Sequence, residues 1–215
     1  LEIETSPWNK DVIYVLAQVP NNPQIKMLRY NGTSWSNYST GIPNEESPMW
    51  MAMDYGSNDA IYIGTQTGNI YYRNANQSSW SSYNDANFPK LRINQLDINY
   101  QDNTLRAGTY GLGIWKTPLV CPTVSNPVNN STAIPSTIYE GIDIVASKNT
   151  LQNTGPTAFR GTESVTLNPG FVATGSATAN RYVKAFIHGC STPGSSEGLK
   201  NGIIVENNEV ILQEQ

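Results

Sequence analysis

The sequence predicts an all-β protein, in which a partial β-propeller precedes a small module built as a β-roll or from stacked strands. Three observations indicate this class: a repeat of blade length in the first half, short β-branched and aromatic runs between glycine and proline turns, and few charged residues. Only 14% of the 215 residues are Asp, Glu, Lys or Arg, against about a quarter in typical domains. This balance is typical of extracellular β proteins.

One apolar phrase occurs three times in the first half of the chain. The copies are VIYVLAQ at 12–18, AIYIGTQ at 60–66 and TLRAGTY at 104–110. Successive copies are 48 and then 44 positions apart, counted from Ile13 to Ile61 and on to Leu105. Four-stranded units at this interval are typical of propeller blades.

Two further phrases recur with the first. Residues 29–38 resemble 73–83, with Trp35 and Trp80 at matching positions, and 51–55 resemble 95–100. Each period then holds about four short strands, and about two and a half blades are visible. A propeller normally closes with at least four blades, so we expect further blades upstream or on another chain. The alternative is a β-sandwich with regularly spaced hairpins.

The local patterns within the repeat favour strands over helices. The stretches 59–64 and 68–73 are short, β-branched and aromatic, and a turn-prone Thr-Gly pair lies between them. Turns that need positive φ are predicted at Gly32, Gly41, Gly56 and Asn58.

The second half predicts a separate small module. Short runs at 142–145, 164–167, 170–173 and 182–187 alternate with glycine and proline turns, and the predicted core is Phe159, Leu167, Phe171 and Phe186. The predicted organisation is propeller blades at 1–119, a Ser-, Asn- and Pro-rich linker at 120–137, the all-β module at 138–190, and a C-terminal tail at 191–215.

The two cysteines, Cys121 and Cys190, predict one disulfide. Two thiols and the single histidine, His188, cannot complete a zinc shell. The bond would close a loop of about 70 residues and stabilise the fold by roughly 4 kcal/mol in the chain-entropy model. Two unpaired buried thiols are the alternative, and a catalytic Cys190–His188 pair is the less favoured use of that cysteine. No metal and no cofactor are predicted.

Composition and spacing also exclude several functions. A net charge of -4 without a basic cluster argues against nucleic-acid binding. No apolar run is long enough to span a bilayer. The carboxylates are scattered, and Asp54 and Asp97 fall at equivalent repeat positions, which favours a structural role over catalysis. We therefore assign no catalytic residue.

Tryptophans are the candidates for ligand binding, because aromatic faces stack on sugars. Trp35 and Trp80 recur once per repeat, as residues that pack between blades do. Trp8 and Trp50 lie outside that repeat pattern and are the predicted ligand-binding residues.

The residues NTLRAGTYGLGIW at 103–115 resemble the closing blade of sialidase-like and glycosidase-like repeat propellers. The Trp35 and Trp80 phrases are similar to the Asp-box of those repeats, but Tyr30 and Ala75 stand where the aspartate belongs.

The residues FRGTESVTLNPGFVA at 159–173, with Gly175-Ser176 and 182–187, resemble a module found near the C termini of secreted Bacteroidota proteins. That resemblance implies export by the type IX secretion system, with 191–215 as a spacer before a sorting domain that is removed, or as the trimmed end of a mature protein. A two-stranded hairpin formed by the apolar runs at 203–205 and 210–212 is the alternative for this stretch. The resemblance also implies an extracellular or outer-membrane-surface location. Since the chain starts at Leu1, we expect a fragment or a processed product.

These expectations together predict a non-catalytic segment of a secreted cell-surface protein. Its role would be adhesion, binding of a protein or glycan at the cell surface, or surface assembly, with the second module joined to secretion or anchoring machinery. One alternative is the accessory C-terminal part of a secreted sialidase-like or other glycoside hydrolase whose active site lies upstream. Another is a spacer or stalk.

Overall fold

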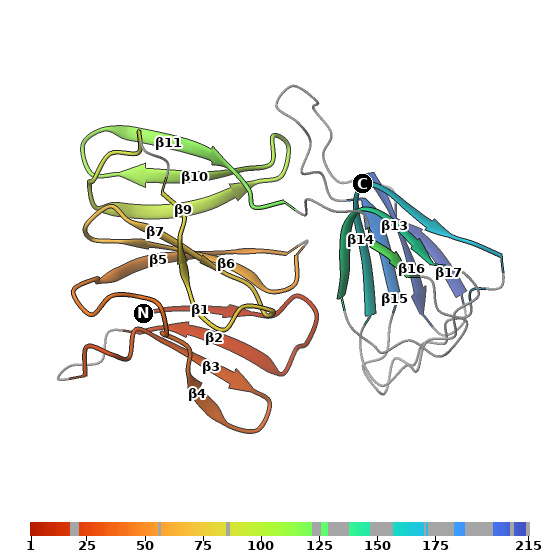
Figure 1. Cartoon of the computed structure of the whole chain (residues 1–215), viewed down its shortest axis with the longest axis horizontal. Helices are drawn as coiled ribbons and strands as arrows, with labels where there is room; N and C mark the ends of the chain where they lie inside the picture. The colour runs from red at the N-terminus through yellow and green to blue at the C-terminus, as the bar shows by residue number, and fades with distance from the viewer. Residues whose placement is uncertain are drawn as a thin grey trace. The chain divides into compact units, whose positions relative to one another are not determined.

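The structure is a computed structural model, and it describes residues 1–17, 22–55, 57–84, 87–121, 126–128, 138–146, 157–169, 171, 183–187, 200–206 and 209–213. All regular secondary structure in these residues is β, with no helix among them, which confirms the predicted all-β class. The chain divides into two compact units (Figure 1). Unit 1 comprises Leu1–Asn99 with Thr104–Pro118, and unit 2 comprises Tyr100–Asn103 with Leu119–Gln215.

Unit 1 consists of three successive antiparallel sheets, in which strands adjacent in sequence pair with one another (Figure 1). Sheet I holds β1 (Glu2–Thr5), β2 (Val12–Leu16), β3 (Met27–Asn31) and β4 (Trp35–Asn37). Sheet II holds β5 (Pro48–Asp54), β6 (Ala60–Thr65), β7 (Ile70–Arg73) and β8 (Ser81–Ser82). Sheet III holds β9 (Ile93–Asn99), β10 (Thr104–Thr109) and β11 (Gly113–Pro118).

Burial along the central strands shows how the sheets are layered. In β6 every residue is buried, because sheet I covers one face of sheet II and sheet III covers the other. In β2, buried residues alternate with half-buried ones. Since successive side chains of a strand point to opposite faces, only one face of sheet I is well covered in the described structure.

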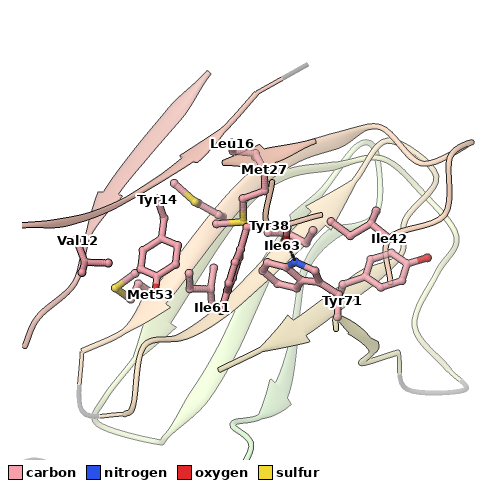
Figure 2. Packing of buried hydrophobic residues seen from close by; sticks show 12 residues of the cluster. Val12, Tyr14, Leu16, Met27, Tyr38, Ile42, Met53, Ile61, Ile63 and Tyr71 are labelled. Carbon is pink, nitrogen blue, oxygen red and sulfur yellow. Dashed lines mark hydrogen bonds between the residues drawn. The ribbon is translucent and has the colours of Figure 1, made fainter. Parts of the chain in front are cut away.

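The core between sheets I and II is built around Tyr38 (Figure 2). The ring of Tyr38 packs edge-on against Tyr14, with 5.5 Å between centroids, and against Trp80 at 6.2 Å. The Trp80 indole nitrogen donates a hydrogen bond to the Tyr38 carbonyl at 2.6 Å. The guanidinium of Arg73 lies 3.6 Å from the centre of the Tyr38 ring. The surrounding buried residues are Val12, Leu16, Met27, Ile42, Met51, Met53, Ile61, Ile63 and Tyr71.

The sequence repeat has a counterpart in this packing. Tyr62 and Tyr83 of sheet II lie 5.4 Å apart at an angle of 60°, and Tyr14 and Tyr38 of sheet I lie 5.5 Å apart at the same angle. Both pairs lie on the face turned to the next sheet along the chain. The repeat therefore preserves an aromatic pair that one sheet offers to its neighbour.

The strand register corrects two details of the predicted repeat. Arg73 pairs with Ile61, whereas the residue that pairs with Ile13 is Tyr30, so Arg73 is not the equivalent of Arg29. The 73–83 phrase has one more residue before its tryptophan than the 29–38 phrase, which shifts the match by one.

The carboxylates Asp54 and Asp97 are likewise not equivalent. Asp54 pairs with Ala60, the first residue of β6, whereas Asp97 pairs with Arg106, the third residue of β10. The two carboxylates therefore lie two positions apart in the register of the repeat. Asp54 is 1% exposed, and Asp97 lies on the surface. The structural role predicted from their equivalence therefore has no basis for Asp97.

Two of the predicted positive-φ turns are confirmed, at Gly32 (φ +94°) and Gly41 (φ +98°). Asn58 was the wrong residue, because its neighbour Asp59 adopts φ 49° instead. Gly56 lies outside the described residues. At Gly41 a Cβ atom would lie 2.4 Å from the carbonyl oxygen of Trp80, so glycine also permits the close approach of sheets I and II.

Unit 2 is one curved, six-stranded mixed sheet (Figure 1). Its strands, in sheet order, are β12 (Asn126–Val128), β13 (Ile138–Ala146), β14 (Thr157–Leu167), β15 (Val183–Ile187), β16 (Lys200–Glu206) and β17 (Glu209–Gln213). The pairs from β12 to β15 are parallel, and those from β15 to β17 are antiparallel. Thus β12 lies within the stretch predicted as a linker, and β16 and β17 lie within the predicted tail.

The core of unit 2 contains Ile144, Ala146, Phe159, Val183 and Ala185. Tyr139, Val165, Leu167 and Phe171 pack against it. The predicted core residues Phe159, Leu167 and Phe171 are thereby confirmed, and Phe186 is half-buried outside this cluster.

Replacing Gly41 by alanine tests the close approach of sheets I and II. Gly41→Ala should lower the free energy of unfolding by about 3 kcal/mol or more, from backbone strain and overpacking together. Gly111→Ala is the matched control, because Gly111 has φ +95° but open space where its Cβ would lie; it should lose about 1 kcal/mol from strain alone. Urea unfolding followed by tryptophan fluorescence reports on unit 1, which contains all five tryptophans. Equal losses in the two variants would contradict this account.

Candidate binding surface

Trp8, a predicted ligand-binding residue, is an interior side chain. It is 7% exposed, and its indole nitrogen donates a hydrogen bond to the carbonyl of Ser57 in the turn between β5 and β6. The Trp8 ring therefore joins the loop before β2 to sheet II and presents no open face on which a sugar could stack.

Trp50, the other predicted ligand-binding residue, lies in β5 and is half-buried. It pairs with Gly64, and the neighbouring Met51 points into the core shared with sheet I. Part of the Trp50 ring is accessible, so its ligand role stays a prediction.

Trp35 and Trp80 differ in burial, although both were predicted to pack between blades. Trp80 is 4% exposed and packs on Tyr38, which confirms the prediction for this residue. Trp35 is 53% exposed in the structure, so inter-blade packing stays a prediction for this residue. The Trp35 ring contacts Tyr30 of the same sheet, with 5.1 Å between ring centroids and a tilt of 39°. Within unit 1, no other described sheet covers the face of sheet I that carries Trp35.

A second exposed group, the β11 patch, lies on the hairpin of sheet III. It consists of Tyr110 (70% exposed), Leu112 (57%), Ile114 (77%) and Trp115 (37%). Strand β11 is the edge strand of its sheet (Figure 1). Trp115 packs edge-on against Phe88, and its indole nitrogen donates to the carbonyl of Leu112 at 3.1 Å.

The buried carboxylate of Asp59 belongs to a polar network that joins sheets I and II. Ser6 donates to one oxygen of Asp59 at 2.7 Å, and the Tyr14 hydroxyl donates to the other at 2.9 Å. Arg29 in turn donates from its Nε to the Tyr14 hydroxyl at 3.2 Å. Asp59 is 7% exposed, and this burial raises its pKa above the ordinary 3.8.

A second network at the other end of the same interface is also internal. Lys26 donates from Nζ to the carbonyls of Asn44 and Glu46. The Glu46 carboxylate accepts hydrogen bonds from Thr67, Asn69 and Tyr71 of sheet II. Both networks hold the sheets together. Asp59 accepts hydrogen bonds from Ser6, next to β1, and from Tyr14 of sheet I. Glu46 is bonded to Lys26 through its carbonyl and to the β6–β7 hairpin through its carboxylate.

Metal and membrane features are absent from the part of the chain that the structure describes. Among those residues, no group of three or more His, Cys, Asp or Glu side chains is placed to hold a metal ion. They also include no helix of sufficient length and apolarity to cross a membrane. Cys190 and His188 lie outside the described residues, so the Cys121–Cys190 disulfide stays a prediction.

No protein-family model matches this chain, and no curated protein or solved structure matches it. The resemblances at 103–115 and 159–173 therefore stay predictions. The strongest functional features of the described residues are the two exposed apolar surfaces of unit 1, on sheets I and III.

Replacing Asp59 by asparagine tests the buried carboxylate. Because the folded chain holds the Asp59 proton more tightly than the unfolded chain, the stability linked to this group is complete below the unfolded pKa and falls as pH rises through the folded pKa. The stability of Asp59→Asn relative to the native chain should therefore increase as the pH rises from about 4 to 7.

Urea unfolding at a series of pH values measures that difference. Asp11→Asn, at a surface carboxyl beside Lys10, controls for the loss of one negative charge. If the difference in stability between Asp59→Asn and the native chain is independent of pH, or decreases as the pH rises, burial does not disfavour the charged form of Asp59.

Proposed function

We propose that this chain is a non-catalytic segment of a secreted cell-surface protein and that it binds a protein partner there through the β11 patch. The exposure of Tyr110, Leu112, Ile114 and Trp115 on one hairpin carries the proposal. Exposed apolar side chains that gather on one element of the surface mark interaction sites.

The edge position of β11 favours a partner that adds a strand. Sheets I and II each have four strands, whereas sheet III has three in the described residues, and β11 pairs only with β10 there. An edge strand presents backbone donors and acceptors to an extended segment, and side chains on either side of it set the specificity. Ile114 and Trp115 lie on opposite faces of β11 and would contact alternate residues of such a segment.

The chemistry of the patch favours a protein over a glycan. Sugars are held by polar groups arranged around an aromatic face, and the indole nitrogen of Trp115 is already bonded to Leu112. Leu112 and Ile114 add aliphatic surface, which suits the apolar centre of a protein interface.

The architecture that we propose for unit 1 is part of a β-propeller, with sheets I to III as successive blades. Antiparallel sheets at blade-like spacing and the repeated tyrosine pairs support it. The resemblance of 103–115 to a closing blade falls on the β10–β11 hairpin. For unit 2, the resemblance of 159–173 to a module of secreted Bacteroidota proteins supports a link to secretion or anchoring machinery at the outer surface.

Site-specific photocrosslinking tests the proposed partner surface. A benzophenone amino acid at Ile114, in the protein as its native cells make it, should yield a protease-sensitive adduct. The same group at Asn76, on an exposed turn of sheet II, should yield none. Leu112→Asp should reduce the Ile114 adduct at least fivefold, since it places a charge in an apolar contact worth about 1 kcal/mol or more. A protease-resistant, carbohydrate-containing adduct, or equal adducts at both positions, would refute a protein partner.

A further inference from the structure

The exposed face of sheet I has the composition of an interior. Cross-strand partners lie on the same face of a sheet, and the register places two rows there. Ile3, Val15, Leu28 and Asn37 form one row, and Thr5, Ile13, Tyr30 and Trp35 form the other. We call these eight residues the Trp35 face. Ile3 is 60% exposed and Trp35 is 53% exposed, although the rows are mainly aliphatic and aromatic.

Sheet II shows what happens to the equivalent face one repeat later. Its rows are Met51, Ile63, Tyr71 and Ser82, and then Met53, Ile61 and Arg73, with Trp80 just before β8. Met51 takes the place of Ile3, and it is 2% exposed. Ile61 and Ile63 are fully buried, whereas the matching Ile13 and Val15 are half-buried. The difference arises because sheet I covers this face of sheet II.

The contacts that sheet I makes with this face of sheet II show which groups a partner of the Trp35 face would need. The Tyr38 carbonyl accepts the indole hydrogen of Trp80, and the Thr40 carbonyl accepts its backbone N–H at 2.8 Å. Gly41 leaves room for the Trp80 backbone. Val12, Leu16 and Met27 supply the aliphatic contacts.

A second copy of this chain does not offer that chemistry at its other end. The outer face of sheet III carries one row of Asp97, Arg106 and Lys116 and another of Gln95, Gly108 and Ile114. Charged side chains opposite Ile13 and Tyr30 would lose solvation without gaining partners there. At Gly64 a Cβ atom would meet Ile93 of sheet III at 2.6 Å, whereas at Gly108 its nearest contact would be Gln95 at 3.7 Å.

We propose that the Trp35 face is a docking surface for a further four-stranded sheet of the same repeat, supplied by residues outside this sequence. That sheet would carry a tyrosine at the Tyr38 position, whose carbonyl accepts the Trp35 indole hydrogen, and a glycine at the Gly41 position. The inference rests on the propeller architecture proposed above, but it concerns sheet I and is independent of the partner proposed for β11.

A tandem duplication tests the inference directly. Residues 1–48 are placed immediately before Leu1 of the full chain, which keeps the 48-residue spacing between Ile13 and Ile61. The added copy carries Trp35→Phe, so that only the original Trp35 reports. Tryptophans are labelled with 5-fluorotryptophan, and the Trp35 fluorine resonance is assigned by its loss in Trp35→Phe of the native chain. A matched control duplication also carries Gly41→Val in the added copy.

A soluble paramagnetic agent should broaden the Trp35 resonance in the native chain and in the control duplication. In the duplication without Gly41→Val, the broadening of the Trp35 resonance should fall to the level seen for Trp80. If the Trp35 resonance is broadened as strongly in the duplication without Gly41→Val as in the native chain, the inference is overturned. Protection of Trp35 in the native chain that increases with protein concentration would also overturn it, because a second copy would then be the occupant. Neither result bears on crosslinking from Ile114, so the two proposals fail separately.

Discussion

The aromatic contact between Tyr38 and Trp80 is the interaction on which the order of unit 1 depends. It combines an edge-on ring contact at 6.2 Å with a hydrogen bond from the Trp80 indole to the Tyr38 backbone. Such a bond fixes Trp80 relative to the chain of the neighbouring sheet as well as to its side chain. Because Gly41 lets the Trp80 backbone approach closely, the two sheets meet in one register, and the methionines and isoleucines of sheet II fill the space between them.

The two polar networks add directional contacts between sheets I and II, because apolar packing alone would not fix how the two sheets align. Asp59 reaches from the β5–β6 turn to Ser6 and Tyr14, and Glu46 reaches from the loop before β5 to sheet II. Buried carboxylates are costly unless they are well supplied with donors. Each network therefore penalises a shift of sheet I past sheet II.

Sequence reasoning identified much of the fold, because a repeat is visible without three-dimensional information. The phrases 12–18, 60–66 and 104–110 each contain a central strand, and Trp80 packs between sheets as its periodic position predicted. Register was harder to predict, since an error of one residue reverses the face of a side chain. That effect explains the mismatch of Arg29 with Arg73. Trp35 follows the repeat in sequence, but its burial depends on a neighbouring sheet that these residues do not include.

The criterion that selected Trp8 as a ligand-binding residue does not distinguish surface from core. Position outside the repeat made Trp8 a candidate, but an irregular segment can contribute to a core, as Trp8 does beside Ser57. The exposure of the β11 patch could not be predicted from the sequence, because the pattern at 103–115 is that of an ordinary strand and turn. The exposure follows from the edge position of β11 in its sheet.

A double-mutant cycle between Tyr38 and Trp80 measures the central contact most directly. Tyr38→Ala, Trp80→Ala and the double variant are compared with the native chain by urea unfolding. Since the two side chains act as one unit, their effects should be non-additive, with a coupling of about 1 kcal/mol. Additive losses, within about 0.3 kcal/mol, would show that the two sheets are held by general apolar burial and that this aromatic pair does not determine their order.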